Sequence, residues 1–249
     1  MGSQQRQPSR QNPNFAVTEA VARRLGPLLP EFVFVGGCAT ALLITDAASA
    51  PVRVTKDVDV IAEAAYADLG DRLRALGFGE DGSEGAPVCR WTAGDLRLDV
   101  MPATGGALGF TNRWYAEALA GPQGFELAPD LRIRLVTGPL FLATKFEAFR
   151  ARGRGDYYAS HDLEDIISVV DGRAELPDEV RLAGDAVRAY LSAHFTALLD
   201  DDDFLSTLVG LFPGDQISQQ RIGIVLPRLR AIAAAAPGPS PHSPLELVE

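Results

Sequence analysis

Lysine is almost absent from this sequence. Its two lysines are Lys56 and Lys145, and arginine carries the rest of the positive charge. Acidic residues outnumber basic ones by 33 to 23, which gives a formal net charge of −10. A chain this acidic does not steer nucleic acid towards itself from a distance, so contact with nucleic acid would need a local basic patch.

Cysteine and long apolar runs are also scarce. Cys38 and Cys89 show neither a metal-ligand spacing nor a disulfide framework, so we interpret them as buried free thiols. No apolar run approaches the roughly 18 residues of a membrane span, so we expect no membrane partner. The polar N-terminus "MGSQQRQPSRQNPN" lacks the apolar core of a secretory signal. We therefore expect a cytoplasmic protein with disordered tails at residues 1–13 and 237–249.

The remaining pattern predicts an α+β protein. Apolar residues make up 47% of the 249 residues, enough for a substantial core. Strands and helices alternate up to about residue 137, and helical patterns follow, so we predict a sheet domain (14–137) and a helical domain (138–236). The expected helices of the second domain are 139–152, 162–170, 178–199 and 215–236, with a short one near 203–209, and 103–124 reads as irregular.

A strand predicted at 57–62, "DVDVIA", carries two acids on one face. Side chains two residues apart in a strand point the same way, so Asp57 and Asp59 lie together while Val58 and Val60 face the core. Carboxylates about 6–7 Å apart repel each other unless a cation lies between them. Mg²⁺ or Mn²⁺ would satisfy them, whereas the alternative is a solvated sheet face.

A third acid follows in the segment 87–102, where the turn at 93–95 predicts two paired strands. The second strand alternates strictly, with Leu98 and Val100 on one face and Asp99 on the other. If this strand lies beside the first, Asp99 joins Asp57 and Asp59. Three such acids are typical of sites where two metal ions, about 3.5–4 Å apart, clamp an in-line phosphoryl displacement.

Two further features suit a phosphate-bearing substrate. In "VFVGGCA", Gly36 and Gly37 lie between a strand and a helix start, where a phosphate can approach backbone N–H groups. Lys145 retains lysine in a chain that otherwise prefers arginine, and lysine offers a compact point charge to a phosphate oxygen.

These residues resemble a known family. The pattern "GG…RVTKDVDV" is similar to the nucleotidyltransferase superfamily of the DNA polymerase β type. The form Arg53-x-Thr55-x-Asp57-x-Asp59 looks more like the AbiEii/MenT toxin nucleotidyltransferases, as does the later stretch "LATKFEAFRARGRGDYYASHDLEDI". The resemblance covers roughly residues 30–172. The spacing from Gly37 to Asp57 exceeds that of many small-molecule nucleotidyltransferases.

The resemblance implies a polymerase β-like sheet domain, a C-terminal helical domain and a set of site residues. Asp57, Asp59 and Asp99 are the implied metal ligands. Asp99 is also the implied general base. Lys145 contacts the phosphates or the nucleobase, and Asp162 and Asp165 position Lys145 or the nucleotide. The implied nucleotide-binding set is Gly36, Gly37, Arg53, Thr55, Lys56, Arg150, Asp162 and Asp165. Arg150, Arg152 and Arg154 could bind triphosphate or RNA, or form a solvated helix end.

The implied reaction is Mg²⁺- or Mn²⁺-dependent transfer of a nucleoside monophosphate from a nucleoside triphosphate to a hydroxyl. The acceptor could be a tRNA 3′ end, a protein or a small molecule. The toxin resemblance implies a cognate antitoxin as partner. Two alternatives stay open: an aminoglycoside-type nucleotidyltransferase, which the acidic charge suits, and a catalytically silent nucleotide-binding or interaction protein.

Overall fold

The computed structural model describes residues 12–62, 66–103, 112–152 and 156–237. Most of the two predicted tails lies outside these residues. Helix α1 (Pro13–Leu25) begins inside the segment predicted as an N-terminal tail. The Asn12 side chain caps it by accepting a hydrogen bond from the Asn14 amide, and Pro13 suits the first helical turn.

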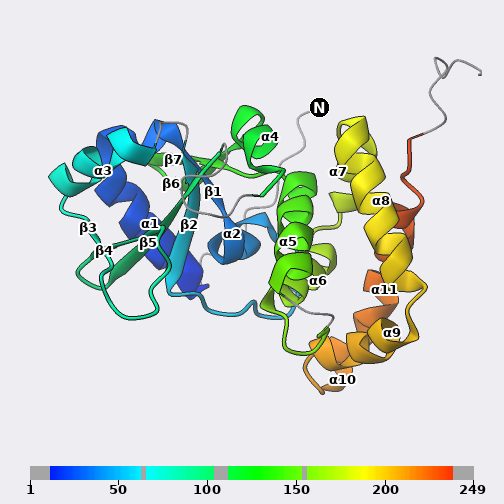
Figure 1. Ribbon diagram of the computed structural model, residues 1–249. Coiled ribbons are helices and arrows are strands. Elements are labelled where there is room, and N and C mark those ends of the chain that lie inside the picture. The colour runs from blue at the N-terminus through cyan, green and yellow to red at the C-terminus, as the bar shows by residue number, and fades with distance from the viewer. Residues whose placement is uncertain (1–11, 63–65, 104–111, 153–155, 238–249) are drawn as a thin grey trace, which may run out of the picture.

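A seven-stranded mixed sheet forms one half of the molecule (Figure 1). Its strands are β1 (Phe32–Val35), β2 (Asp57–Ala62), β3 (Gly79–Glu80), β4 (Arg90–Ala93), β5 (Leu96–Pro102), β6 (Gln123–Ala128) and β7 (Leu131–Leu135), in the order β3-β4-β5-β2-β1-β7-β6. The central β2 runs parallel to β5 and antiparallel to β1. This confirms the predicted strand at 57–62 and places the β4–β5 hairpin beside it.

Helices surround the sheet and build the second half. Those of the sheet half are α1, which packs across β2 and β5, α2 (Gly36–Leu43), α3 (Tyr66–Ala75) and α4 (Tyr115–Ala120). The others are α5 (Gly138–Arg152), α6 (His161–Gly172), α7 (Leu176–Leu182), α8 (Asp185–Leu199), α9 (Asp202–Leu208), α10 (Gln216–Gln220) and α11 (Ile222–Ala233). Short 3₁₀ helices occupy Gly26–Glu31 and Val209–Leu211. None of the helices in the described ranges is long and apolar enough to cross a membrane.

Several element predictions were wrong in detail. The single helix predicted over 178–199 is two helices, α7 and α8, because the chain becomes extended at Ala183 and Gly184. The helix predicted over 215–236 likewise divides into α10 and α11. Helix α4 lies within 103–124, which we expected to be irregular.

The two halves share one apolar core. Helix α5 begins at Gly138, where the chain changes character, and packs against α2 on one side and α6 and α8 on the other (Figure 1). Buried apolar residues from strands and helices, among them Val33, Val58, Phe141 and Leu229, belong to one continuous cluster. The predicted boundary near residue 137 therefore marks a change of element type within a single packed body.

A buried arginine between α10 and α11 joins the C-terminal helices to the loop before β2. The Nε of Arg221 donates to both Asp171 carboxylate oxygens at 2.7 Å, and its Nη2 donates to Asp46 at 2.7 Å. Its Nη1 donates to the Ala48 carbonyl at 3.0 Å. Arg221 and Asp171 are only 7% and 2% exposed, so each charge depends on the other for compensation.

Replacing Arg221 with alanine should destabilise the whole protein. Removing one partner leaves Asp171 buried and unpaired, which typically costs about 3–5 kcal/mol. Urea denaturation followed by circular dichroism measures the change. Arg230→Ala, at an exposed position on α11, the helix that Arg221 precedes, is the control and should stay within about 0.5 kcal/mol of wild type. Equal stability of the two variants would contradict the role of this ion pair.

Candidate functional site

Two acids lie side by side on neighbouring parallel strands. The register pairs Asp59 of β2 with Asp99 of β5, and Asp57 with Arg97. The intervening Val58 and Leu98 are fully buried on the opposite face. The predicted alternation of both strands is therefore confirmed, and Asp57, Asp59 and Asp99 share one face of the sheet.

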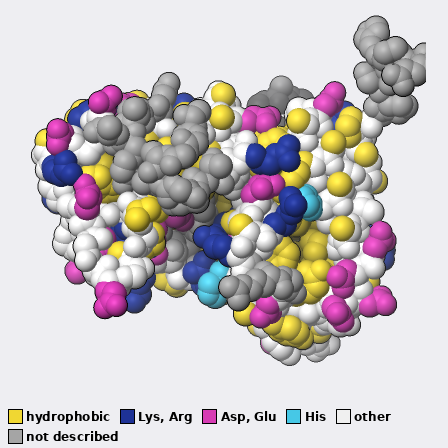
Figure 2. Space-filling view, in the orientation of Figure 1, with side chains coloured by type: hydrophobic (Ala, Val, Ile, Leu, Met, Phe, Trp, Pro, Cys, Tyr) yellow, Lys and Arg dark blue, Asp and Glu magenta, His cyan; other side chains and the backbone are white. Residues whose placement is uncertain are grey.

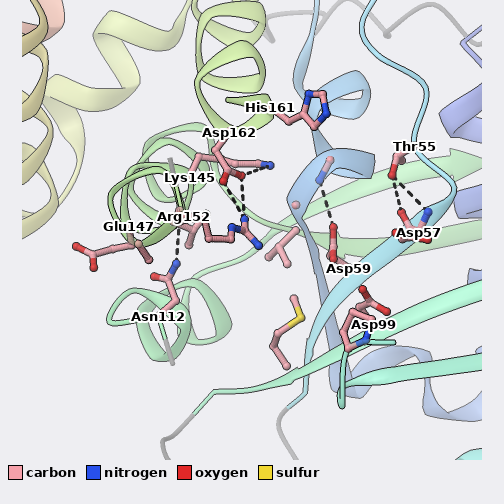
Figure 3. Close-up of a pocket in the computed structure, with 18 of the residues that line it drawn as sticks. Thr55, Asp57, Asp59, Asp99, Asn112, Lys145, Glu147, Arg152, His161 and Asp162 are labelled. Atoms are coloured by element: carbon pink, nitrogen blue, oxygen red, sulfur yellow. Dashed lines mark hydrogen bonds and ion pairs between the residues drawn. The ribbon is translucent and has the colours of Figure 1, made fainter. Parts of the chain in front are cut away.

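This acidic face forms one wall of a cleft of about 1100 Å³. The start of α2 lies at its edge, and α5 and α6 supply the opposite wall with Lys145, Arg152 and Asp162 (Figure 3). Figure 2 shows Lys or Arg side chains and a histidine gathered where the two halves of the molecule meet. The cleft thus lies between the sheet and the helical half, with acids on the first wall and mixed charges on the second.

The carboxylate of Asp59 lies directly against the double glycine. The Gly37 amide donates to its Oδ2 at 3.3 Å. Burial raises the pKa of Asp59 to about 7, with Asp99 and Asp57 adding to the rise while Lys145 and the Gly37 amide oppose it. Gly36 has φ of 65°, and a Cβ added there would overlap the Asp59 side chain. Glycine is therefore required at position 36 for both its backbone conformation and its lack of a side chain.

A buried asparagine holds the segment that leads into β2. Asn14 of α1 is fully buried, its Oδ1 accepts from the Thr55 amide at 2.9 Å, and its Nδ2 donates to the Arg53 carbonyl at 3.0 Å. The Thr55 hydroxyl in turn accepts from the Asp57 amide. These bonds fix where Asp57 enters the cleft, and no motif in the sequence singled out Asn14.

Lys145 reaches the cleft as part of a buried ion-pair cluster. Its Nζ donates to Asp165 at 2.6 Å and to Asp162 at 3.1 Å. Burial alone lowers the pKa of Lys145, but Asp165 and Asp162 more than reverse this and raise it. Burial likewise opposes the ionisation of Asp162, but Lys145 and Arg152 overcome it, and the pKa of Asp162 is lowered. Lys145 is therefore a fixed, charged ammonium group.

Arg90 of β4 is a site residue that we did not predict. It pairs with Asp99 across the hairpin, and its guanidinium bonds both Asp99 and Asp57 at 2.8 Å. A signal was available in the sequence. If the tight turn at Gly94 and Asp95 sets Ala93 opposite Leu96, counting back along both strands puts Arg90 opposite Asp99.

The donor chemistry of this face fits a divalent cation. Carboxylate oxygens are the ligands that Mg²⁺ and Mn²⁺ prefer, and Asp57 Oδ1 is buried without a hydrogen-bond partner. As they stand, however, no three acidic, histidine or cysteine side chains in the described ranges form a ready-made metal site. Arg90 instead bonds both Asp57 and Asp99 and compensates part of their charge, so cation binding there requires these side chains to rearrange.

The other predicted nucleotide-binding residues divide into two groups. Gly36, Gly37, Arg53, Thr55 and Asp162 line the cleft, and Asp165 supports Lys145 from behind it. The structure does not bring Lys56 or Arg150 into the cleft lining. Lys56 is exposed, and Arg150 is an exposed residue 3.5 Å from Glu147. Arg154 lies outside the described residues.

Comparison with solved structures identifies the fold. An antigenic nucleotidyltransferase-like protein from Paracoccidioides brasiliensis aligns over 92% of this chain and 95% of its own, with 18% identity and a TM-score of 0.51. JHP933 from Helicobacter pylori aligns over 91% and 94% of the two chains, with 14% identity and a TM-score of 0.48. No family model matches the sequence, and neither does any curated protein. The first likeness confirms a nucleotidyltransferase-like fold, and the narrower AbiEii/MenT resemblance stays a prediction.

The two glycines should respond differently to alanine. Gly36→Ala places a side chain in a left-handed backbone conformation, which costs about 1–2 kcal/mol, and displaces Asp59 as well. Gly37→Ala meets only ordinary contacts, 3.4 Å from Arg53 and 3.6 Å from Thr55, and should change stability by less than about 1 kcal/mol. Thermal unfolding of both variants tests this difference, and a Gly36→Ala protein as stable as wild type would refute it.

Proposed function

We propose that this protein is a nucleotidyltransferase that transfers a nucleoside monophosphate from a nucleoside triphosphate to a hydroxyl group, with Mg²⁺ or Mn²⁺. The observation that carries the proposal is the in-register pair Asp59 and Asp99, with Asp59 accepting a hydrogen bond from the Gly37 amide at the start of α2. Lys145 lines the same cleft. The nucleotidyltransferase-like fold supports the same reaction class.

The balance of charge in the cleft supports a need for a divalent cation. The described lining carries the carboxylates of Asp57, Asp59, Asp99, Glu147, Asp156 and Asp162, against the cations Arg53, Arg90, Lys145 and Arg152. A triphosphate adds further negative charge, so acids and substrate repel each other unless extra positive charge enters with the nucleotide. When bound, the cation supplies that charge and polarises the phosphoryl oxygens.

The chain's own groups have distinct tasks in this proposal. The amides at the start of α2 and the Lys145 ammonium hold the triphosphate, which favours in-line geometry. The acceptor oxygen forms a bond to the α-phosphorus, and the bond from that phosphorus to the bridging oxygen breaks and releases pyrophosphate. Asp99 takes the acceptor's proton, once its carboxylate is free of Arg90.

The acceptor is the finer part of the proposal. The sequence pattern from Arg53 to Asp59 resembles toxin nucleotidyltransferases, so we propose a toxin role with a tRNA 3′ end as the first acceptor to test, and an antitoxin as partner. The excess of carboxylates in the cleft favours a second candidate, a cationic small molecule of the aminoglycoside kind. Thermal-shift titration with tRNA and with aminoglycosides separates the two.

Asp59→Asn should abolish transfer without destabilising the protein. Asp59 would help to hold the cation that stabilises charge at the reacting phosphate, so losing its carboxylate should reduce the rate by about 100-fold or more. The melting temperature should stay equal or rise, because the substitution relieves repulsion among three neighbouring acids. The assay incubates purified protein with Mg²⁺, each labelled triphosphate and a mixture of acceptors.

Asp95→Asn is the matched control, because Asp95 is an exposed residue of the adjacent hairpin turn. It should leave transfer unchanged. A large loss of stability in Asp59→Asn would point instead to a structural ion pair. If the wild-type protein labels neither itself nor any acceptor, the catalytically silent alternative replaces the proposal.

A further inference from the structure

The Arg90 side chain lies across the acidic face and bonds the oxygens that a cation would need. Its Nε donates to Asp99 Oδ1, and its Nη2 donates to Asp99 Oδ2 and Asp57 Oδ2, all at 2.8 Å. The side chain is only 15% exposed. Two charged partners and three short bonds make this a strong, oriented interaction.

We propose that Arg90 and a divalent cation compete for Asp57 and Asp99, so that Arg90 compensates part of the negative charge of the site until cation and nucleotide arrive together. The inference rests on the proposed function. In it, Arg90 is a positioning residue that holds Asp57 and Asp99 beside each other in the absence of metal. Its guanidinium then leaves the carboxylates and binds the phosphates of the incoming nucleotide.

Competition follows from the way the oxygens are occupied. Both Asp99 oxygens and one Asp57 oxygen already accept from Arg90, and two cations cannot share them at bonding distance without strong repulsion. Two carboxylates still offer oxygens that Arg90 does not bond. Asp59 accepts from the Gly37 amide, and Asp57 Oδ1 is without a hydrogen-bond partner, with the exposed Arg97 as a longer ion-pair partner at 3.7 Å. A first ion can therefore bind there and displace Arg90 from its neighbours.

The displaced guanidinium of Arg90 would move towards the phosphates of the nucleotide in the same cleft. Arg90 lines the same cavity as Gly37 and Lys145, so a guanidinium that leaves the carboxylates stays within the cleft that would hold the triphosphate. A planar guanidinium binds a phosphate through two parallel hydrogen bonds, which a lysine cannot do. Nucleotide binding therefore favours release of the carboxylates, and metal and nucleotide should strengthen each other's binding.

The direct test measures Mn²⁺ binding in the absence of nucleotide. The electron paramagnetic resonance signal of free Mn²⁺ reports how much of the ion is unbound. Arg90→Ala should bind Mn²⁺ about tenfold or more tightly than wild type, because the competitor is gone. A non-hydrolysable triphosphate should tighten Mn²⁺ binding in wild type more than in Arg90→Ala. Arg23→Ala is the control, because Arg23 also bonds two acids, Asp130 and Glu19, and does not line the cleft.

Each outcome separates this inference from the proposed function. Equal Mn²⁺ affinity in wild type and Arg90→Ala overturns the competition while leaving a metal-binding site in place. Absence of Mn²⁺ binding in every variant, with and without triphosphate, overturns both.

If Arg90→Ala folds poorly, its melting temperature with and without Mn²⁺ provides a second test. The variant should melt below wild type in EDTA and recover most of the difference in Mn²⁺, and Arg90→Lys should fall between the two. The same deficit in EDTA and in Mn²⁺ would overturn the inference, because it would show Arg90 to be a structural residue that a cation cannot replace.

Discussion

The structure depends on the pairing of β2 with β5, which sets Asp59 beside Asp99 on the cleft side of the sheet. Parallel pairing at this register aligns like charges that water alone screens poorly in a partly buried site. The surrounding groups reduce this repulsion. The Gly37 amide and Lys145 favour the ionised form of Asp59, and Arg90 bonds the other two acids and compensates part of their charge. The cleft is therefore organised around the compensation of carboxylates.

Much of this arrangement could be predicted from local sequence patterns. The alternation of "DVDVIA" predicted both the limits of β2 and the face on which Asp57 and Asp59 lie, because the period of a strand is two whatever surrounds it. The pairing of Lys145 with Asp162 and Asp165 was also anticipated, though only through family resemblance. Nothing local indicated Asn14, whose partners Arg53 and Thr55 lie about 40 residues away along the chain.

The errors have a common physical origin. The break between α7 and α8 and the position of Lys56 outside the cleft depend on how distant elements pack, and periodicity within a short window does not contain that information. Arg90 is a different case, because hairpin counting alone could have placed it opposite Asp99. Opposite charges that face one another across a predicted hairpin are therefore candidate ion pairs, and the turn that sets the register is enough to identify them.

The segment before β2 is hydrogen-bonded to other elements at several points along its length. These bonds determine which motions can rearrange the side chains of the site. Arg221 holds Asp46 and Ala48 to the helical half, and Asn14 holds Arg53 and Thr55 to α1. With the acidic strand and the opposite helices tied together, the cleft walls form one frame, and separation of two domains is not needed to alter the site. Rearrangement then depends on individual side chains, among them the largely buried Arg90, rather than on the microsecond-to-millisecond motions of domain closure.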